Sequence, residues 1–316
     1  PYVTEQQWTH DGSRFIVKDD STGVIYEYNI HDETLHYLDY TTISGTGFAQ
    51  ITPDDIMYYS KSPTEIWKMD LNTYERTLIS TVSAARNVGM LSVTDDGKYI
   101  TCAWYEQDDA KDWSGGANRI RVIPRLDTET GKWDTTLTHE FDEPYPNAGH
   151  PLLNPKDGNL VMFCHEGTTN YVHDRIWAGN FTTGDTWNLF KQAHIPGNVS
   201  LTGETTGHEV WGGSGEYAYF VKYTNDQNVG QSGLCRVSKD GEDREYINGD
   251  YLFWHCYSTK DDKWVVGDTQ EKSAFARVVL VSTETYEPHL LATFDLPKRS
   301  PDHPEQPHPV ISQDGH

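Results

Sequence analysis

One short turn motif recurs along the whole sequence. Each copy has an apolar residue, a polar residue and then Asp-Gly or a close variant, followed by alternating aromatic and β-branched residues. Asp-Gly between alternating segments predicts a β-hairpin, because glycine tolerates the positive φ of tight hairpin turns. Each copy therefore predicts two antiparallel strands. The copies begin at Trp8, Ile51, Val93, Asn154, Gly212 and Ser258, and a partial seventh begins at Ile311.

A second unit lies between these copies and predicts two further strands each time. It begins at Ile25, Ile66, Ile120, Ile176, Leu234 and Val278. Four strands per repeat predict an all-β fold, a seven-bladed β-propeller of four-stranded antiparallel blades that forms one domain over residues 1–316. A β-sandwich would have a similar strand density but would not repeat this two-part unit. We expect the last blade to be incomplete, because the sequence stops at His316.

The charge and cysteine content exclude several classes of function. With 48 acidic against 25 basic residues, the net charge of −23 disfavours binding to nucleic acid or an anionic membrane surface. Long polyanionic substrates are disfavoured for the same reason. The four cysteines contain no C-x-x-C pair, so the sequence predicts neither a disulfide framework nor a zinc ribbon.

Imidazole side chains recur just before the hairpin copies in four consecutive repeats. Because this position is equivalent in each repeat, we expect these side chains to converge on one end of the predicted central channel. The residues are His150, His208, His255 and the group His303, Gln306 and His308.

Four of these residues are candidate ligands of a divalent metal, namely His255, His303, Gln306 and His308. Mixed imidazole and amide donors suit a first-row metal of intermediate hardness such as Mn²⁺, with Fe²⁺, Zn²⁺ or Ca²⁺ as alternatives. The competing interpretation is a solvated, proline-rich tail, with His255 as a buried histidine that only makes hydrogen bonds.

Two further residues are candidates for catalysis. His208 lies one repeat before His255, and a neutral imidazole near a metal is a candidate general base. The guanidinium of Arg175 could bind a substrate carboxylate with two parallel hydrogen bonds. Alternatively, Arg175 forms a structural ion pair with Asp174 or Glu166.

Five separated motifs resemble the oligogalacturonate lyases of polysaccharide lyase family 22. They occur in the family's order, cover most of the chain and are densest between residues 149 and 270. The resemblance implies a seven-bladed propeller, a bound manganese ion and β-elimination of short uronate oligosaccharides to 4,5-unsaturated products. The motifs are Gly149-His150-Pro151 with Cys164-His165-Glu166-Gly167, Asp174-Arg175-Ile176-Trp177, Gly207-His208-Glu209-Val210-Trp211, His255, and Pro307-His308-Pro309.

By position, the resemblance implies that His208 is the proton-abstracting base, that Arg175 lies near the reacting carboxylate and that His255 is the first metal ligand. This chain departs from the family's pattern at two places. The family reads Gln-x-x-His-Pro-His-Pro where this chain has His303 and Gln306 in exchanged order. It also reads Gly-Pro-His-Asp where this chain has Gly167-Thr-Thr-Asn, a change that could alter the substrate subsites.

Three more residues, His150, His165 and Tyr171, are predicted to bind substrate. If the substrate were instead ulvan, the same three would become candidates for base and acid. A non-enzymatic propeller that binds other proteins is a further alternative, and it predicts no tightly bound metal. The free cysteines and the family's role favour a cytoplasmic location, with the periplasm or secretion as alternatives.

Overall fold

The computed structural model describes residues 6–43, 48–82, 86–106, 122–139, 141, 147–167, 172, 174–193, 204–223, 232–269, 275–295 and 307–315. These residues form strands and turns and contain no helix. None of the described residues therefore belongs to a helix long and apolar enough to cross a membrane. The chain divides into two compact units. The first contains residues 1–167, 177–187 and 312–316, and the second contains residues 168–176 and 188–311.

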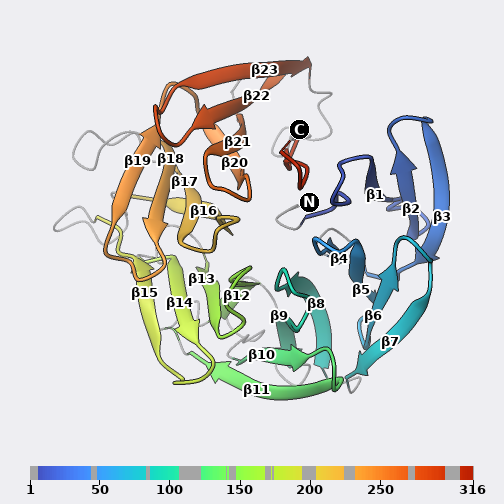
Figure 1. Cartoon of the computed structure of the whole chain (residues 1–316). Helices are drawn as coiled ribbons and strands as arrows, with labels where there is room; N and C mark the ends of the chain where they lie inside the picture. The colour runs from blue at the N-terminus through green and yellow to red at the C-terminus, as the bar shows by residue number, and fades with distance from the viewer. Residues whose placement is uncertain are drawn as a thin grey trace. The chain divides into compact units, whose positions relative to one another are not determined.

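The strands of the first half form three antiparallel sheets in chain order (Figure 1). The first sheet has three strands, β1 (Arg14–Lys18), β2 (Val24–Asn29) and β3 (Thr34–Tyr40). The second has four, β4 (Ala49–Ile51), β5 (Ile56–Ser62), β6 (Glu65–Asp70) and β7 (Arg76–Thr81). The third also has four, β8 (Arg86–Val93), β9 (Tyr99–Glu106), β10 (Val122–Asp127) and β11 (Lys132–Thr138).

Three further four-stranded sheets follow with the same simple order. One contains β12 (Asn147–Leu153), β13 (Leu160–Glu166), β14 (Ile176–Asn180) and β15 (Thr186–Phe190). The next contains β16 (Thr206–Trp211), β17 (Tyr217–Lys222), β18 (Gly233–Ser238) and β19 (Arg244–Asn248). The last contains β20 (Phe253–Ser258), β21 (Trp264–Thr269), β22 (Phe275–Ser282) and β23 (Pro288–Asp295).

The repeated motif forms the hairpin turn between the first two strands of the five four-stranded sheets, as predicted, and its first copy forms the turn between Trp8 and β1. Gly12, Gly97 and Gly215 have φ values of 66°, 66° and 76°, the left-handed conformation that glycine adopts without strain. In the two copies that read Asp-Asp, Asp55 and Asp262 adopt φ values of 61° and 56° at the same point. The turn geometry is therefore retained where glycine is absent.

The prediction of seven blades was wrong for the described residues, which form six sheets. The predicted seventh repeat begins at Ile311, and its described residues, 311–315, contain a turn but no strand. Instead, Gln313 Nε2 donates hydrogen bonds of 2.8 and 3.3 Å to the carbonyl oxygens of Trp8 and Thr52. Trp8 in turn forms a β-bridge with Phe15 beside the three-stranded sheet.

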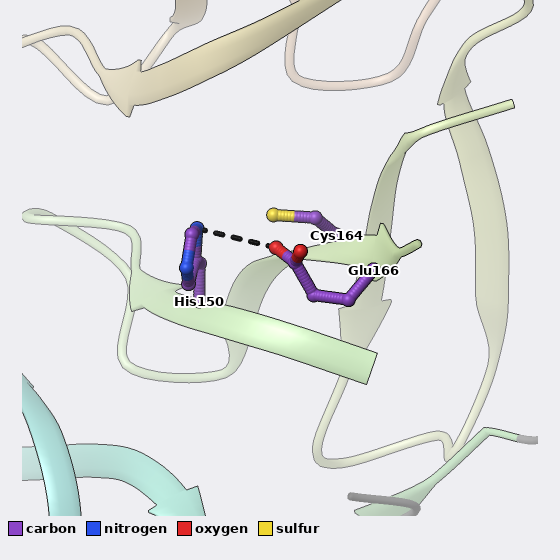
Figure 2. Close-up of side chains that lie close together, drawn as sticks. All are labelled: His150, Cys164 and Glu166. Atoms are coloured by element: carbon purple, nitrogen blue, oxygen red, sulfur yellow. Dashed lines mark ion pairs between the residues drawn. The ribbon is translucent and has the colours of Figure 1, made fainter. Parts of the chain in front are cut away.

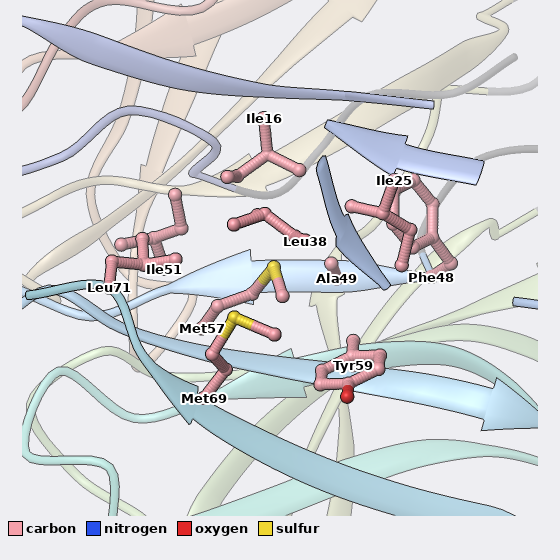
Figure 3. Close-up of a cluster of buried hydrophobic side chains, with 10 residues drawn as sticks. All are labelled: Ile16, Ile25, Leu38, Phe48, Ala49, Ile51, Met57, Tyr59, Met69 and Leu71. Carbon is pink, nitrogen blue, oxygen red and sulfur yellow. The ribbon is translucent and has the colours of Figure 1, made fainter. Parts of the chain in front are cut away.

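Each unit has an apolar core between the faces of its sheets. In the first unit, side chains of β1, β2 and β3 pack against those of β4, β5 and β6 (Figure 3). Alternating strand residues point to opposite faces, so each sheet can supply one such layer to its neighbour. In the second unit, the corresponding cluster joins the β16–β19 and β20–β23 sheets and includes Val210, Val221, Val265 and Val279. The single-domain prediction stays a prediction.

Candidate active site

Three histidines lie side by side in the second unit. The ring centroid of His255 is 4.2 Å from that of His208 and 3.5 Å from that of His308. His208 belongs to β16, His255 belongs to β20, and His308 lies in the 307–312 segment that follows the last strand. The structure thus brings together imidazoles from distant parts of the sequence, since His208 and His308 are 100 positions apart.

A backbone irregularity aims His208 into this cluster. The register of β16 against β17 shifts between Gly207 and Val210, so two residues of β16 have no direct partner. Such a β-bulge redirects the side chain at the irregularity. His208 adopts φ of 54°, and His308 adopts φ of 46° before Pro309. Left-handed φ is uncommon for non-glycine residues and costs of order 1–3 kcal/mol, so the surrounding structure must hold these residues in place.

Asp268 fixes His255 and His308. Its carboxylate lies 3.0 and 2.9 Å from His255 Nδ1 and accepts a 2.8 Å hydrogen bond from the His255 backbone N–H. It also accepts a 3.0 Å hydrogen bond from the backbone N–H of His308. Asp268 is fully buried. A carboxylate on Nδ1 places the proton there and turns Nε2 toward a potential ligand, an arrangement typical of metal-binding histidines.

Tyr223 and Trp254 surround His208. The hydroxyl of Tyr223 forms a short hydrogen bond with His208 Nδ1. The Trp254 ring lies 5.0 Å from the His208 ring and 5.0 Å from the Tyr223 ring, measured between centroids. Burial, reinforced by the neighbouring His255, lowers the pKa of His208 to about 2. His208 is therefore neutral at ordinary pH, as a general base must be.

Burial acts on His308 in the same direction. It lowers the pKa of His308 to about 3, and the nearby His255 adds to this effect. His308 is therefore neutral at ordinary pH. Neutral imidazole is the form of histidine that binds metals.

Arg175 lies next to the His208 segment. Its Nε is 3.5 Å from Glu209 Oε2, and a Cβ added to Gly207 would lie 3.5 Å from the same nitrogen. Asp174 and Glu166 were the ion-pair partners considered from the sequence, but the structure shows a pair with Glu209. Asp174 instead accepts a 2.9 Å hydrogen bond from the backbone N–H of Gln192. The cation is therefore held close to the candidate base, and it helps to lower the pKa of His208.

The predicted substrate-binding histidines lie in the first unit, in two different settings. His150 Nδ1 faces Glu166 at 3.4 Å, and Cys164 lies next to this pair (Figure 2). The His165 ring stacks on Phe141 with a centroid distance of 4.0 Å and an interplanar angle of 4°. Because side chains alternate along β13, His165 points to the opposite face of the strand from Cys164 and Glu166. Their roles in substrate binding stay predictions.

Three predicted site residues, Tyr171, His303 and Gln306, lie outside the described residues. Conversely, Tyr223, Asp268 and the pairing of Glu209 were not predicted from the sequence. Asp268 could have been found from the turn motif. If β20 and β21 are paired residue by residue, starting from the Asp261-Asp262 turn, Asp268 lies opposite His255. Tyr223 lies at the corresponding end of the preceding hairpin.

The comparison with known families decides the assignment. A family model described as oligogalacturonate lyase matches residues 1–274. The chain belongs to the oligogalacturonate lyase family. This confirms the resemblance noted in the sequence, and it places the chain among pectin-degrading lyases. An oligogalacturonate lyase of Dickeya dadantii is 28% identical over 292 residues, a match that covers 84% of this chain and 68% of that protein.

Solved structures of family members share the fold. An oligogalacturonate lyase in complex with manganese has a TM-score of 0.79 and 20% identity, and the match covers 99% of this chain and 84% of that one. An oligogalacturonate lyase from Vibrio parahaemolyticus has a TM-score of 0.78 and 21% identity, with the same coverage. At these identities the likeness establishes the fold, an all-β propeller of four-stranded antiparallel blades.

Proposed function

We propose that this lyase cleaves short oligogalacturonates by β-elimination, with His208 as the base and a 4,5-unsaturated uronate as product. The observation that carries the proposal is a half-buried, neutral His208 between two residues, Gly207 and Glu209, that both lie close to Arg175. Base and cation are thus adjacent, which is what proton abstraction next to a carboxylate requires. The family assignment supports the same reaction.

The reaction needs removal of a weakly acidic proton from C5 of the uronate. His208 takes this proton, the electron pair forms the C4=C5 double bond, and the bond from C4 to the glycosidic oxygen breaks. The leaving oxygen then takes a proton from water. Arg175 would bind the substrate carboxylate and stabilise the negative charge that develops there as the C5 proton leaves.

A metal site fits the residues around His255. Asp268 holds Nδ1 of His255, so Nε2 is oriented as a ligand atom, and the His308 ring lies next to it. We propose that His255 and His308, with His303 and Gln306, bind a divalent ion, with Mn²⁺ favoured by its presence in the solved relative. When bound, the ion would add positive charge near the substrate carboxylate and make the C5 proton more acidic.

The charge of the protein supports a short substrate. A net charge of −23 repels a long polyanion, whereas a short oligosaccharide can be neutralised locally by Arg175 and a cation. A cytoplasmic location would suit this use of short fragments and stays a prediction.

The test is the absorbance of the unsaturated product with digalacturonate and with ulvan, combined with metal analysis of the protein. We expect turnover of digalacturonate only. His208→Ala should lower turnover by about 10²–10⁴-fold, the usual contribution of a general base, while the bound metal is retained. His289→Ala is the matched control, because His289 is exposed on the outer strand β23 of the same unit. Turnover retained in His208→Ala would rule out His208 as the base.

A further inference from the structure

A second group of metal-binding side chains lies in the first unit. It consists of His150 on β12 with Cys164 and Glu166 on β13, and the ligand atoms of all three lie within 4.8 Å of one another (Figure 2). We propose that these residues form a metal site for a divalent, thiophilic ion such as Zn²⁺. This site shares no residue with the imidazole cluster of the second unit, and it does not depend on the proposed lyase mechanism.

The hairpin places the three side chains together. Cys164 and Glu166 are two positions apart on β13, so both point to one face of the strand. Gly149 of β12 pairs with Cys164, and the register then shifts between Gly149 and Leu152. The bulge turns His150, with φ of 47°, toward the same face, where its Nδ1 lies 3.4 Å from Glu166 Oε1.

Gly149 makes room for the Glu166 carboxylate. A Cβ at this position would lie 2.3 Å from Glu166 Cγ, closer than real atoms approach. The missing side chain therefore lets Glu166 lie over β12 within reach of His150. The glycine and the bulge together bring donors from two strands to one point.

The donor set indicates the kind of metal. Thiolate, imidazole and carboxylate are the three side-chain donors that Zn²⁺ binds, in four-coordinate sites where water can take the remaining position. The second unit offers imidazole and amide donors instead. Because soft thiolate favours zinc and harder donors favour manganese, the two sites should differ in metal preference. Binding would release the proton of the Cys164 thiol, so affinity should rise with pH.

Cobalt is the probe that separates the two sites, because a thiolate ligand gives Co²⁺ a near-ultraviolet charge-transfer band and imidazole does not. The full chain, freed of bound metal, is titrated with Co²⁺ and then with Zn²⁺. We expect one thiolate band, which Zn²⁺ abolishes by displacing the weaker-binding cobalt. The band should be retained in His255→Ala and lost in Cys164→Ser. Cys102→Ser is the matched control, because Cys102 is also a buried strand cysteine of the first unit.

Two variants at less buried positions test the same site if Cys164→Ser does not fold. His150→Gln and Glu166→Gln, whose side chains are 24% and 18% exposed, should each weaken Co²⁺ binding at least tenfold. Absence of a thiolate band in the unmodified chain would overturn the site. So would a band that survives Cys164→Ser, or unchanged Co²⁺ affinity in both glutamine variants.

Discussion

The hairpins β12–β13 and β16–β17 have a similar backbone conformation but place different side chains around it. In each, a Gly-His pair sits at a β-bulge, and the histidine adopts φ of 47° or 54°. Gly149 pairs with Cys164 and Gly207 pairs with Val221. The residue two positions after each of these glycine partners contacts the histidine. This residue is Glu166 in the first hairpin and Tyr223 in the second.

The second-strand residues set the chemistry of each histidine. A carboxylate and a thiol beside His150 create a donor set for a cation. His208 faces a phenol instead of a carboxylate, and its burial beside His255 keeps it uncharged, which suits a base. The repeat therefore provides a strained, well-aimed histidine, and substitutions on the facing strand decide its use.

Among the changes that compare the two hairpins, the largest expected effect comes from breaking the Tyr223–His208 contact. Tyr223→Phe removes the hydroxyl next to His208 Nδ1, so the ring is no longer held in one orientation and tautomer. We expect kcat to fall about 10–100-fold with little change in KM, measured by formation of the unsaturated product. Tyr217→Phe, on the same strand β17, is the control. A kcat within twofold of the unmodified enzyme would show that the phenol does not position the base.

The two glycines allow a matched stability test. Gly149→Ala should destabilise the protein by about 1–3 kcal/mol, because its Cβ would lie 2.3 Å from Glu166. Gly207→Ala should cost less, since its Cβ would lie 3.2 Å from the Tyr223 hydroxyl, where a small shift suffices. Urea denaturation measures both. Equal losses would mean that the close approach of Glu166 to β12 does not distinguish the two hairpins.

The last expected effect is a pH dependence of stability in the metal-free protein. The folded-state pKa values of His208 and His308, about 2 and about 3, lie below the ordinary value of 6.5. The unfolded chain therefore binds more protons below pH 6.5. The free energy of unfolding should fall as the pH drops from 6.5, by at most about 1.4 kcal/mol per pH unit for each histidine.

The control for this pH effect is the variant His208→Gln with His308→Gln. It should show a shallower pH dependence in urea denaturation, because the two groups that resist protonation are gone. A slope between pH 5 and 6.5 as steep as that of the unmodified protein would attribute the effect to other groups.

Much of the fold could be predicted because hairpins are local. The turn motif and strand alternation act over about ten residues, and both the strands and their antiparallel pairing followed from them. The blade number did not follow, because the turn motif at Ile311 does not by itself fix which residues the segment around it pairs with. In the structure, the residues after Ile311 contact the Trp8 and Thr52 carbonyls through Gln313 instead.

The site could be predicted in part. Equivalent positions in the repeats identified His208, His255 and His308, which the structure brings together. Their partners were missed because contacts such as Tyr223 with His208 depend on the register shift inside β16. His150 was grouped with the same cluster for its equivalent position, although its neighbours Glu166 and Cys164 give it another environment.

The carboxylate of Asp268 also has a consequence for the order of folding. Asp268 contacts His255, which precedes it by 13 residues in the same hairpin. It also accepts a hydrogen bond from the backbone of His308, which follows Asp268 by 40 residues. Local hairpins form early, whereas closing a long loop is slower and requires the hairpin as a template. The enzyme should therefore gain its third histidine last, after the rest of the second unit is already folded.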